Sequence, residues 1–141
     1  MPILNYTTSI DVAKTMGEIQ GALARRGVTR ISTLFDDNGV AAGLGFTMKT
    51  DYGLRDFQLP VRTDGVLAAM KADTKVARSS VNPAQAARVA WRIAKDWLEA
   101  QAALIDAQLA TLDEVMMPYM VDSTGQTMYA VYRSTQKAID A

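Results

Sequence analysis

The chain has 141 residues, of which 49% are hydrophobic and 21% charged, and its 15 basic residues equal its 15 acidic residues in number. These values are typical of one globular domain, and zero net charge disfavours a protein that wraps duplex nucleic acid, which needs excess positive charge. The absence of cysteine and histidine excludes disulfides, thiol nucleophiles, Cys/His zinc sites and Ser-His-Asp triads.

The N-terminal segment is predicted to contain a short strand followed by a helix. Residues 3–8 can form the strand. Thr15 and Glu18 have the Thr-x-x-Glu spacing of a capping box, in which each side chain bonds a free backbone N–H of the first helical turn. Gly27 can adopt the left-handed conformation that ends a helix. These signals predict a helix over 16–26.

Alternation of apolar and polar residues predicts three antiparallel strands between about residues 28 and 61. The positions that share a face within each strand are Ile31, Thr33 and Phe35, then Ala42, Leu44, Phe46 and Met48, then Phe57, Leu59 and Val61. Asn38-Gly39 favours a type I′ hairpin turn, and the sequence TDYG supplies the next turn. Gly43 and Gly45 indicate a bulge, or a place where another group approaches the backbone closely.

Helices are predicted for the rest of the chain. Residues 64–76 form one, with Asp64 as a possible cap. Asn82-Pro83 begins a long helix that reaches about residue 110. Thr111 and Glu114 form a second possible capping box at the start of a short helix, and residues 127–139 form a terminal helix or an extended arm.

The order of elements is therefore β-α-β-β-β-α-α-α. It predicts a single α+β domain over residues 1–141, in which helices pack on one face of an antiparallel three- to four-stranded meander.

The long helix carries a polar stripe and a wide apolar arc. The stripe consists of Arg88, Arg92, Lys95, Asp96, Glu99 and Asp106. Within it, Arg92–Asp96 and Lys95–Glu99 have the i, i+4 spacing of helical ion pairs. The apolar arc covers about 200°, against roughly 100° for a helix that buries one face. One side is expected to lie on the sheet, and the other to need the later helices or a second copy of the chain.

This arc predicts a homo-oligomer, a dimer in its simplest form. The residues expected at the interface are Trp91, Leu98, Gln101, Ile105 and Gln108. The two glutamines lie inside the apolar arc, and a buried amide needs a partner. They would find one across a symmetric dimer, or in the C-terminal segment of the same chain.

The basic residues of the stripe have two interpretations. Arg88, Arg92 and Lys95 form either a solvated, salt-bridged face or an anion site, because the planar fork of arginine suits phosphate. In the second case, arginines of the meander are expected to converge with them if the register allows; these are Arg30, Arg55 and Arg62. Aromatic residues can either pack in the core or stack on a base; these are Trp91, Trp97, Tyr119, Tyr129 and Tyr132.

Two segments together resemble a small protein family encoded by phages and prophages, especially of Gram-positive bacteria. They are AARVAWRIAKDWLEAQAALIDAQLATLDEVMMPYM and TTSIDVAKTMGEIQGALARRG, and residues 87–101 are the more specific part. The resemblance implies a phage context, in which small proteins serve DNA metabolism or block host defence.

The chain holds no catalytic or metal-binding pattern: the acidic pairs at 36–37 and 113–114 suit a turn and a helix start, and Gly43-Leu44-Gly45 is no dinucleotide fingerprint. The N-terminal residues do not have the pattern of a signal peptide, and no apolar segment is long enough to predict a membrane span.

We therefore expect a non-catalytic protein of the host cytoplasm, without metal or cofactor. It would bind and sequester a small phosphorylated or nucleotide ligand, such as a host immune signal. The alternatives are a single-stranded nucleic-acid-binding or annealing protein, and an inhibitor that binds a host protein.

Overall fold

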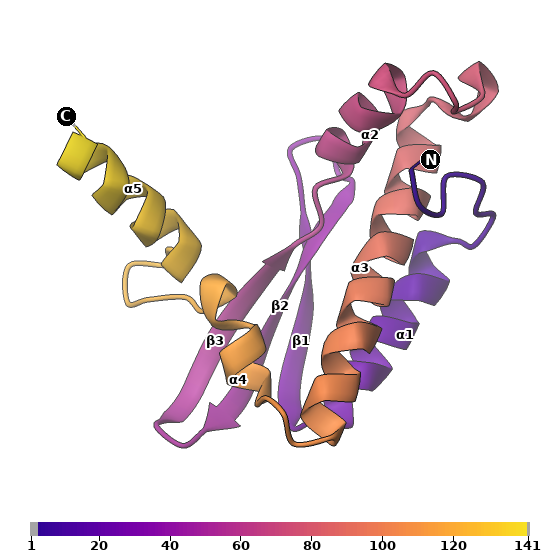
Figure 1. Cartoon of the computed structure of the whole chain (residues 1–141). Coiled ribbons are helices and arrows are strands. Elements are labelled where there is room, and N and C mark those ends of the chain that lie inside the picture. Colours follow the sequence, from indigo (N-terminus) through magenta and orange to yellow (C-terminus); the bar gives the residue numbers. More distant parts are fainter. Residues whose placement is uncertain (1–2, 141) are drawn as a thin grey trace.

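A computed structural model describes residues 3–140 of the chain and the side chains of residues 3–136 (Figure 1). In chain order its elements are α1 (Val12–Ala24), β1 (Val28–Phe35), β2 (Ala41–Thr50), β3 (Gly53–Pro60), α2 (Thr63–Ala72), η1 (Arg78–Ser80), α3 (Pro83–Asp106), α4 (Leu112–Val115), η2 (Met117–Tyr119) and α5 (Met128–Asp140). The α+β class and the antiparallel meander are confirmed, with a helix rather than a strand at the start.

The three strands form one antiparallel sheet in the order β1-β2-β3. The register places Leu44 opposite Leu59 and Phe46 opposite Phe57, and the rings of the two phenylalanines stack with centroids 5.1 Å apart. This face carries the core, which also contains Ile19 and Leu23 of α1, Trp91 and Leu98 of α3, and Leu112 of α4. The opposite face of the sheet is more polar, and we call it the open face.

Helix α3 begins as predicted and buries two sides within its own chain. The Asn82 side chain accepts a hydrogen bond from the Gln85 amide at 2.8 Å, and Pro83 occupies the first turn. One side of α3 packs on the sheet and α1, while Val89 joins Met70 and Val76 in a second apolar cluster with the α2 region. The helix ends at Asp106 rather than near 110, because Gln108 adopts a left-handed conformation with φ of 62°.

The predictions for the N-terminal segment are wrong in two respects. Residues 3–10 form a looped segment instead of a strand, and the carbonyls of Tyr6 and Thr8 in it accept hydrogen bonds from the Gln85 side chain, each at 2.9 Å. Helix α1 begins at Val12, so Thr15 lies inside it, fully buried, and does not cap it. The expected left-handed end of this helix is confirmed at Gly27, whose φ is 93°.

The turns and bends of the sheet are only partly as predicted. Gly39 has a φ of 77° but Asn38 does not adopt a positive φ, whereas a type I′ turn needs both. Instead the Asp36 carboxylate accepts hydrogen bonds from the amides of Asn38 and Val40, each at 2.9 Å, and organises a longer loop. The close approach expected in β2 is present, because a Cβ on Gly43 would lie 2.7 Å from the Leu59 carbonyl oxygen.

The remaining helices follow the predicted order with shifted ends. Helix α2 starts at Thr63 and stops at Ala72, so Asp64 lies in its first turn and is not its cap. The capping box of α4 is confirmed, with Thr111 and Glu114 each accepting from the other's amide at 3.3 Å. The C-terminal segment is a helix, α5, that projects from the body beyond η2 (Figure 1).

Within the described part of the chain, none of the helices combines the length and the apolar character that a membrane crossing would require.

Candidate functional site

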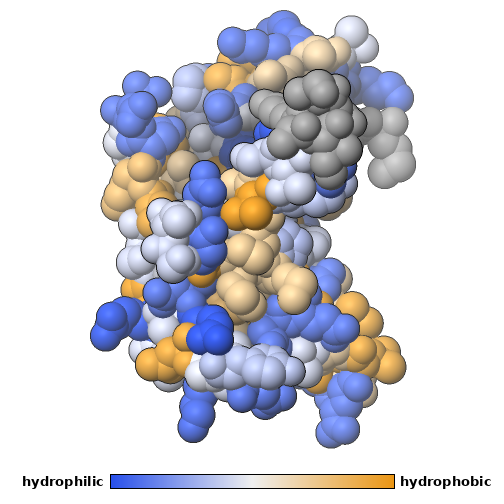
Figure 2. Space-filling view, turned by 90° about the vertical axis from the view of Figure 1, so that its left-hand side faces the viewer, coloured by the Kyte–Doolittle hydropathy of each residue, from blue (hydrophilic) through white to orange (hydrophobic). Residues whose placement is uncertain are grey.

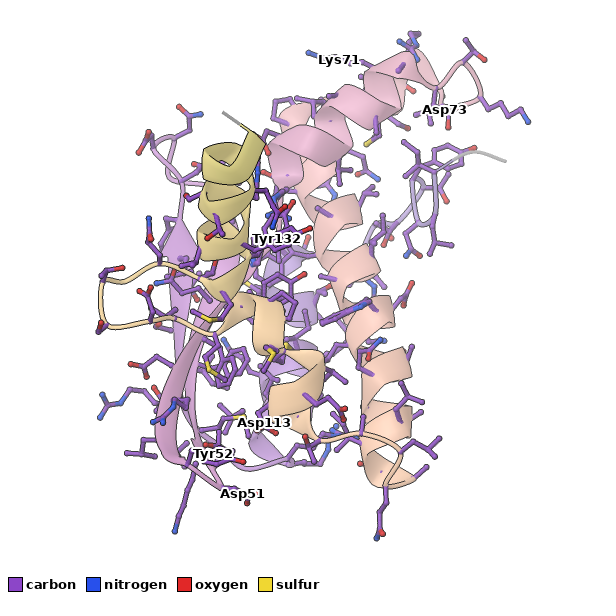
Figure 3. The ribbon with its side chains drawn as sticks, turned by 60° about the vertical axis from the view of Figure 1, so that its left-hand side comes forward. Asp51, Tyr52, Lys71, Asp73, Asp113 and Tyr132 are labelled. Atoms are coloured by element: carbon purple, nitrogen blue, oxygen red, sulfur yellow. The ribbon has the colours of Figure 1, made fainter. Side chains whose placement is uncertain are left out.

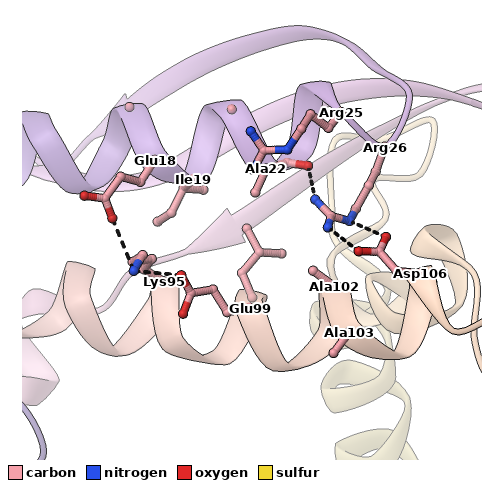
Figure 4. Close-up of a pocket in the computed structure, with 13 residues that line it drawn as sticks. Glu18, Ile19, Ala22, Arg25, Arg26, Lys95, Glu99, Ala102, Ala103 and Asp106 are labelled. Carbon is pink, nitrogen blue, oxygen red and sulfur yellow. Dashed lines mark hydrogen bonds and ion pairs between the residues drawn. The ribbon is translucent and has the colours of Figure 1, made fainter.

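Two basic residues of the α3 stripe are engaged by α1. The Glu18 carboxylate lies 3.1 Å from Arg92. It also lies 3.3 Å from Lys95, which in turn lies 2.7 Å from Glu99 (Figure 4). Arg92 further donates to the Thr15 hydroxyl at 3.3 Å. The predicted pair Lys95–Glu99 is therefore confirmed, while the predicted pair Arg92–Asp96 is wrong. The Asp96 carboxylate instead accepts from the Asn5 amide at 2.8 Å.

The charges of this network stabilise one another. Partial removal from water raises the pKa of Glu18, but hydrogen bonds from Lys95 and Arg92 outweigh it, so the pKa lies below its ordinary value. The hydrogen bond to Glu99 is the main cause that raises the pKa of Lys95. Because Glu18 already compensates both cations, this part of the stripe is better suited to joining α1 and α3 than to holding an anion.

Beside this network runs a groove of about 520 Å³ between α1 and α3 (Figure 4). Small residues form much of its wall; they are Gly17, Gly21, Ala22, Ala102 and Ala103. At its other end Arg26 forms a bidentate pair with Asp106, with contacts of 2.8 and 3.2 Å. The groove is thus closed at both ends by paired charges.

The other predicted arginines do not join the network around Glu18. Arg88 donates through Nε to the Gln85 side chain at 2.8 Å. Arg30 lies on the open face, where it lines a shallow hollow with Ser32 and Thr47. Arg55 pairs with Met48 and therefore belongs to the face of the sheet that carries the core. Its side chain donates a hydrogen bond to the Leu54 carbonyl. Arg30 and Arg55 therefore lie on opposite faces of the sheet, and the expected convergence is wrong.

The predicted oligomer interface is also wrong for its central residues. Trp91 is 0% exposed and Leu98 2% exposed, both inside the core of their own chain. The Trp91 indole donates to the Ala41 carbonyl at 3.0 Å, which ties α3 to the start of β2. Gln101 and Ile105 are half-buried and Gln108 is exposed. The apolar arc of α3 is thus largely covered within one protomer.

Tyr119 lies in a different place, a cleft at the outer edge of β3. This β3-edge cleft consists of two adjoining hollows of about 310 and 190 Å³, which share Pro60, Arg62 and Tyr119. Figure 2 shows a notch in this side of the molecule with apolar residues on its floor. The larger hollow lies toward α3 and contains Trp97, and the smaller lies toward the open face and contains Tyr129.

The aromatic residues of the cleft have defined geometry. The rings of Trp97 and Tyr119 meet edge to face, with centroids 6.4 Å apart and an interplanar angle of 83°. Tyr129 stacks on Tyr132 one turn later in α5, with centroids 6.4 Å apart. Both tyrosines of α5 are exposed, and Figure 3 shows Tyr132 directed from α5 toward the body of the molecule.

Local sequence explains how these groups come together. Pro60 ends β3, a position at the sheet edge where the lack of an N–H costs no ladder hydrogen bond. Arg62 follows in the short link to α2, and Tyr119 ends η2, which a bridge between Met120 and Phe57 holds against β3. Among the side chains described, the Arg62 guanidinium forms no ion pair and donates no hydrogen bond. The backbone carbonyl of Arg62 accepts from the Val66 amide at 3.2 Å.

The sequence distinguishes Arg62 only as one of three arginines of the meander, and it does not indicate that Tyr119 lies beside Trp97. The signal for Arg62 was its position directly after a strand and before a helix. The contact between Trp97 and Tyr119 depends on the path of the chain after α3, which has no local signature.

Residues 3–136 bring together no group of three or more acidic side chains that could hold a metal ion. No family model, curated protein or solved structure matches the chain.

Proposed function

We propose that the protein is a non-catalytic binding protein whose β3-edge cleft takes a small ligand with an aromatic ring and an anionic group. A nucleotide is the class of compound that combines the two. The observation that carries the proposal is that Arg62, which pairs with no carboxylate among the described side chains, lines an apolar cleft together with Trp97 and Tyr119.

The chemistry of the cleft suits each half of such a ligand. The exposed parts of Trp97 and Tyr119 offer aromatic surface on which a base can stack, a contact worth about 1–3 kcal/mol. The guanidinium of Arg62 offers a planar pair of donors that matches a phosphate. The larger hollow, about 310 Å³, is at the lower end of the size that small-ligand sites have.

The resemblance of residues 87–101 to phage proteins adds a biological role to the proposal. A phage protein that binds a nucleotide without transforming it would lower the free concentration of that nucleotide in the host cytoplasm. We therefore propose sequestration of a nucleotide signal of host defence as the role of the cleft.

Calorimetry against cyclic and linear mononucleotides, dinucleotides and single-stranded oligonucleotides tests the proposal. For whichever of these compounds the wild type binds, Arg62→Ala should weaken the affinity about ten- to hundredfold, the loss typical of one charge-assisted contact. Arg25→Ala is the matched control, because Arg25 is also exposed but lines the distant α1–α3 groove. Equal affinities of the two variants, or no binding of any compound by the wild type, would contradict the proposal.

Tryptophan fluorescence gives an independent readout. Trp91 is fully buried, so quenching by a ligand in the cleft reports on Trp97. If oligonucleotides bind much more tightly than mononucleotides and Arg30→Ala weakens them, the alternative of a single-stranded nucleic-acid binder is favoured, with the open face as its surface.

A further inference from the structure

The outer edge of β1 is a second unassigned surface, independent of the cleft. Strand β1 pairs with β2 on one side, and none of the described residues forms a strand on its other side (Figure 1). It has eight residues, VTRISTLF, with one charge and no proline. Natural edge strands are usually short, charged, interrupted by proline or covered, and β1 has little of this protection.

The hydrogen-bonding phase of the sheet identifies the groups that this edge presents. The Val61 amide donates to the Ala42 carbonyl at 2.8 Å, which makes these two a hydrogen-bonded pair. Such pairs alternate along an antiparallel ladder, so Phe46 also bonds toward β3. Its neighbour on the other side, Ile31, must therefore direct its N–H and C=O outward. The same alternation applies to Thr33.

The middle of the strand is regular and self-complementary. Register shifts against β2 lie between Val28 and Arg30 and between Leu34 and Phe35. The regular part is therefore Arg30–Leu34, and its centre is Ser32, an exposed residue of the open face.

We propose that β1 pairs antiparallel with β1 of a second copy of the chain, around a two-fold axis at Ser32. In this register the outward groups of Ile31 meet those of the partner's Thr33, and each pair exchanges two backbone hydrogen bonds. Arg30 faces the partner's Leu34 rather than a like charge. The two sheets become one continuous sheet with both helical layers on the same side, and Phe35, 65% exposed in the single copy, lies beside the partner's Thr29.

A single-cysteine experiment tests this register directly, because the chain has no cysteine of its own. At the axis, Ser32 and the partner's Ser32 form a non-hydrogen-bonded pair, with Cα atoms about 4.5 Å apart. That distance lies within the range of about 4.4–6.8 Å that disulfides span. Under mild oxidation Ser32→Cys should form a covalent dimer. Thr47→Cys, on the same face but on the central strand, should not.

Charge substitution at the same position gives the second measurement. Sedimentation should show a dimer for the wild type and monomers for Ser32→Lys and for Ser32→Glu, each folded by circular dichroism. A mixture of the two variants should restore a dimer, because opposite charges then face each other. Thr47→Lys should remain dimeric. A monomeric wild type, or a dimer that Ser32→Lys leaves intact, would overturn the proposal.

Discussion

Glu18 belongs to α1, yet its carboxylate holds two cations of α3, Arg92 and Lys95. The bond between Lys95 and Glu99 could be predicted because helical spacing alone brings i and i+4 together. The choice of Glu18 over Asp96 as the partner of Arg92 could not, because it requires knowing that α1 packs alongside α3. The capping box predicted for Thr15 and Glu18 is wrong because a Thr-x-x-Glu spacing inside a helix is indistinguishable in sequence from one at its start.

We predict that the free energy of unfolding depends on pH through the ionisation of Glu18. Its pKa in the folded protein lies below the ordinary value of 4.5, so between the two values the unfolded chain binds more protons. The stabilisation is therefore present above pH 4.5 and is lost as the pH falls through the folded pKa.

Urea unfolding of the wild type and of Glu18→Gln measures this effect. The variant should have a lower free energy of unfolding at neutral pH, because Arg92 and Lys95 lose their shared carboxylate. The difference should shrink as the pH falls through the folded pKa of Glu18, where the wild-type carboxyl also takes up a proton. A difference that stayed constant over this range would show that the charge of Glu18 is not the cause.

Elements with a strong repeating pattern were the most predictable. The three strands follow from period-two alternation, and α3 from Asn82-Pro83 and its long periodic segment. Turns and helix ends were less predictable, because a single side chain determines where they form. Asp36 replaces the expected tight turn by capping two amides, and Gln108 ends α3 early by adopting a left-handed conformation.

The two glycines of β2 give a matched prediction about this element. An added Cβ at Gly43 would meet the Leu59 backbone oxygen at 2.7 Å, whereas at Gly45 it would meet the Ser32 hydroxyl at 2.9 Å. A side chain can rotate away, but the oxygen moves only if β2 and β3 separate. Gly43→Ala should therefore lower the free energy of unfolding by about 1–3 kcal/mol, the usual cost of overpacking, and Gly45→Ala by clearly less. Equal losses in denaturant unfolding would contradict this reasoning.

The whole molecule is held together by contacts that join distant parts of the chain. The N-terminal segment is attached at three places: the Ile3 amide donates to Asp73, the Asn5 side chain to Asp96, and the Gln85 side chain to the carbonyls of Tyr6 and Thr8. None has a local signal, which is why residues 3–8 were predicted to be a strand. The β3-edge cleft could not be predicted for the same reason, because Arg62, Trp97 and Tyr119 come from three separate parts of the chain.

Gln85 provides the test at this scale. It is 8% exposed and satisfies two carbonyls of the N-terminal segment, so Gln85→Ala should leave both without their donor. The expected loss is about 1–3 kcal/mol of unfolding free energy, the cost of unsatisfied buried polar groups. Hydrogen exchange should accelerate at the amides of residues 3–10 and change little in the sheet.

Two variants serve as controls. Gln101→Ala removes the same kind of side chain from the same helix, at a site where it bonds to none of the described residues. Arg88→Ala removes a hydrogen-bond partner of Gln85 but leaves the bonds from Gln85 to the two carbonyls in place. Both controls should therefore leave exchange in residues 3–10 near the wild-type rate, and unchanged exchange there in Gln85→Ala would show that the segment is held by Asp73 and Asp96 alone.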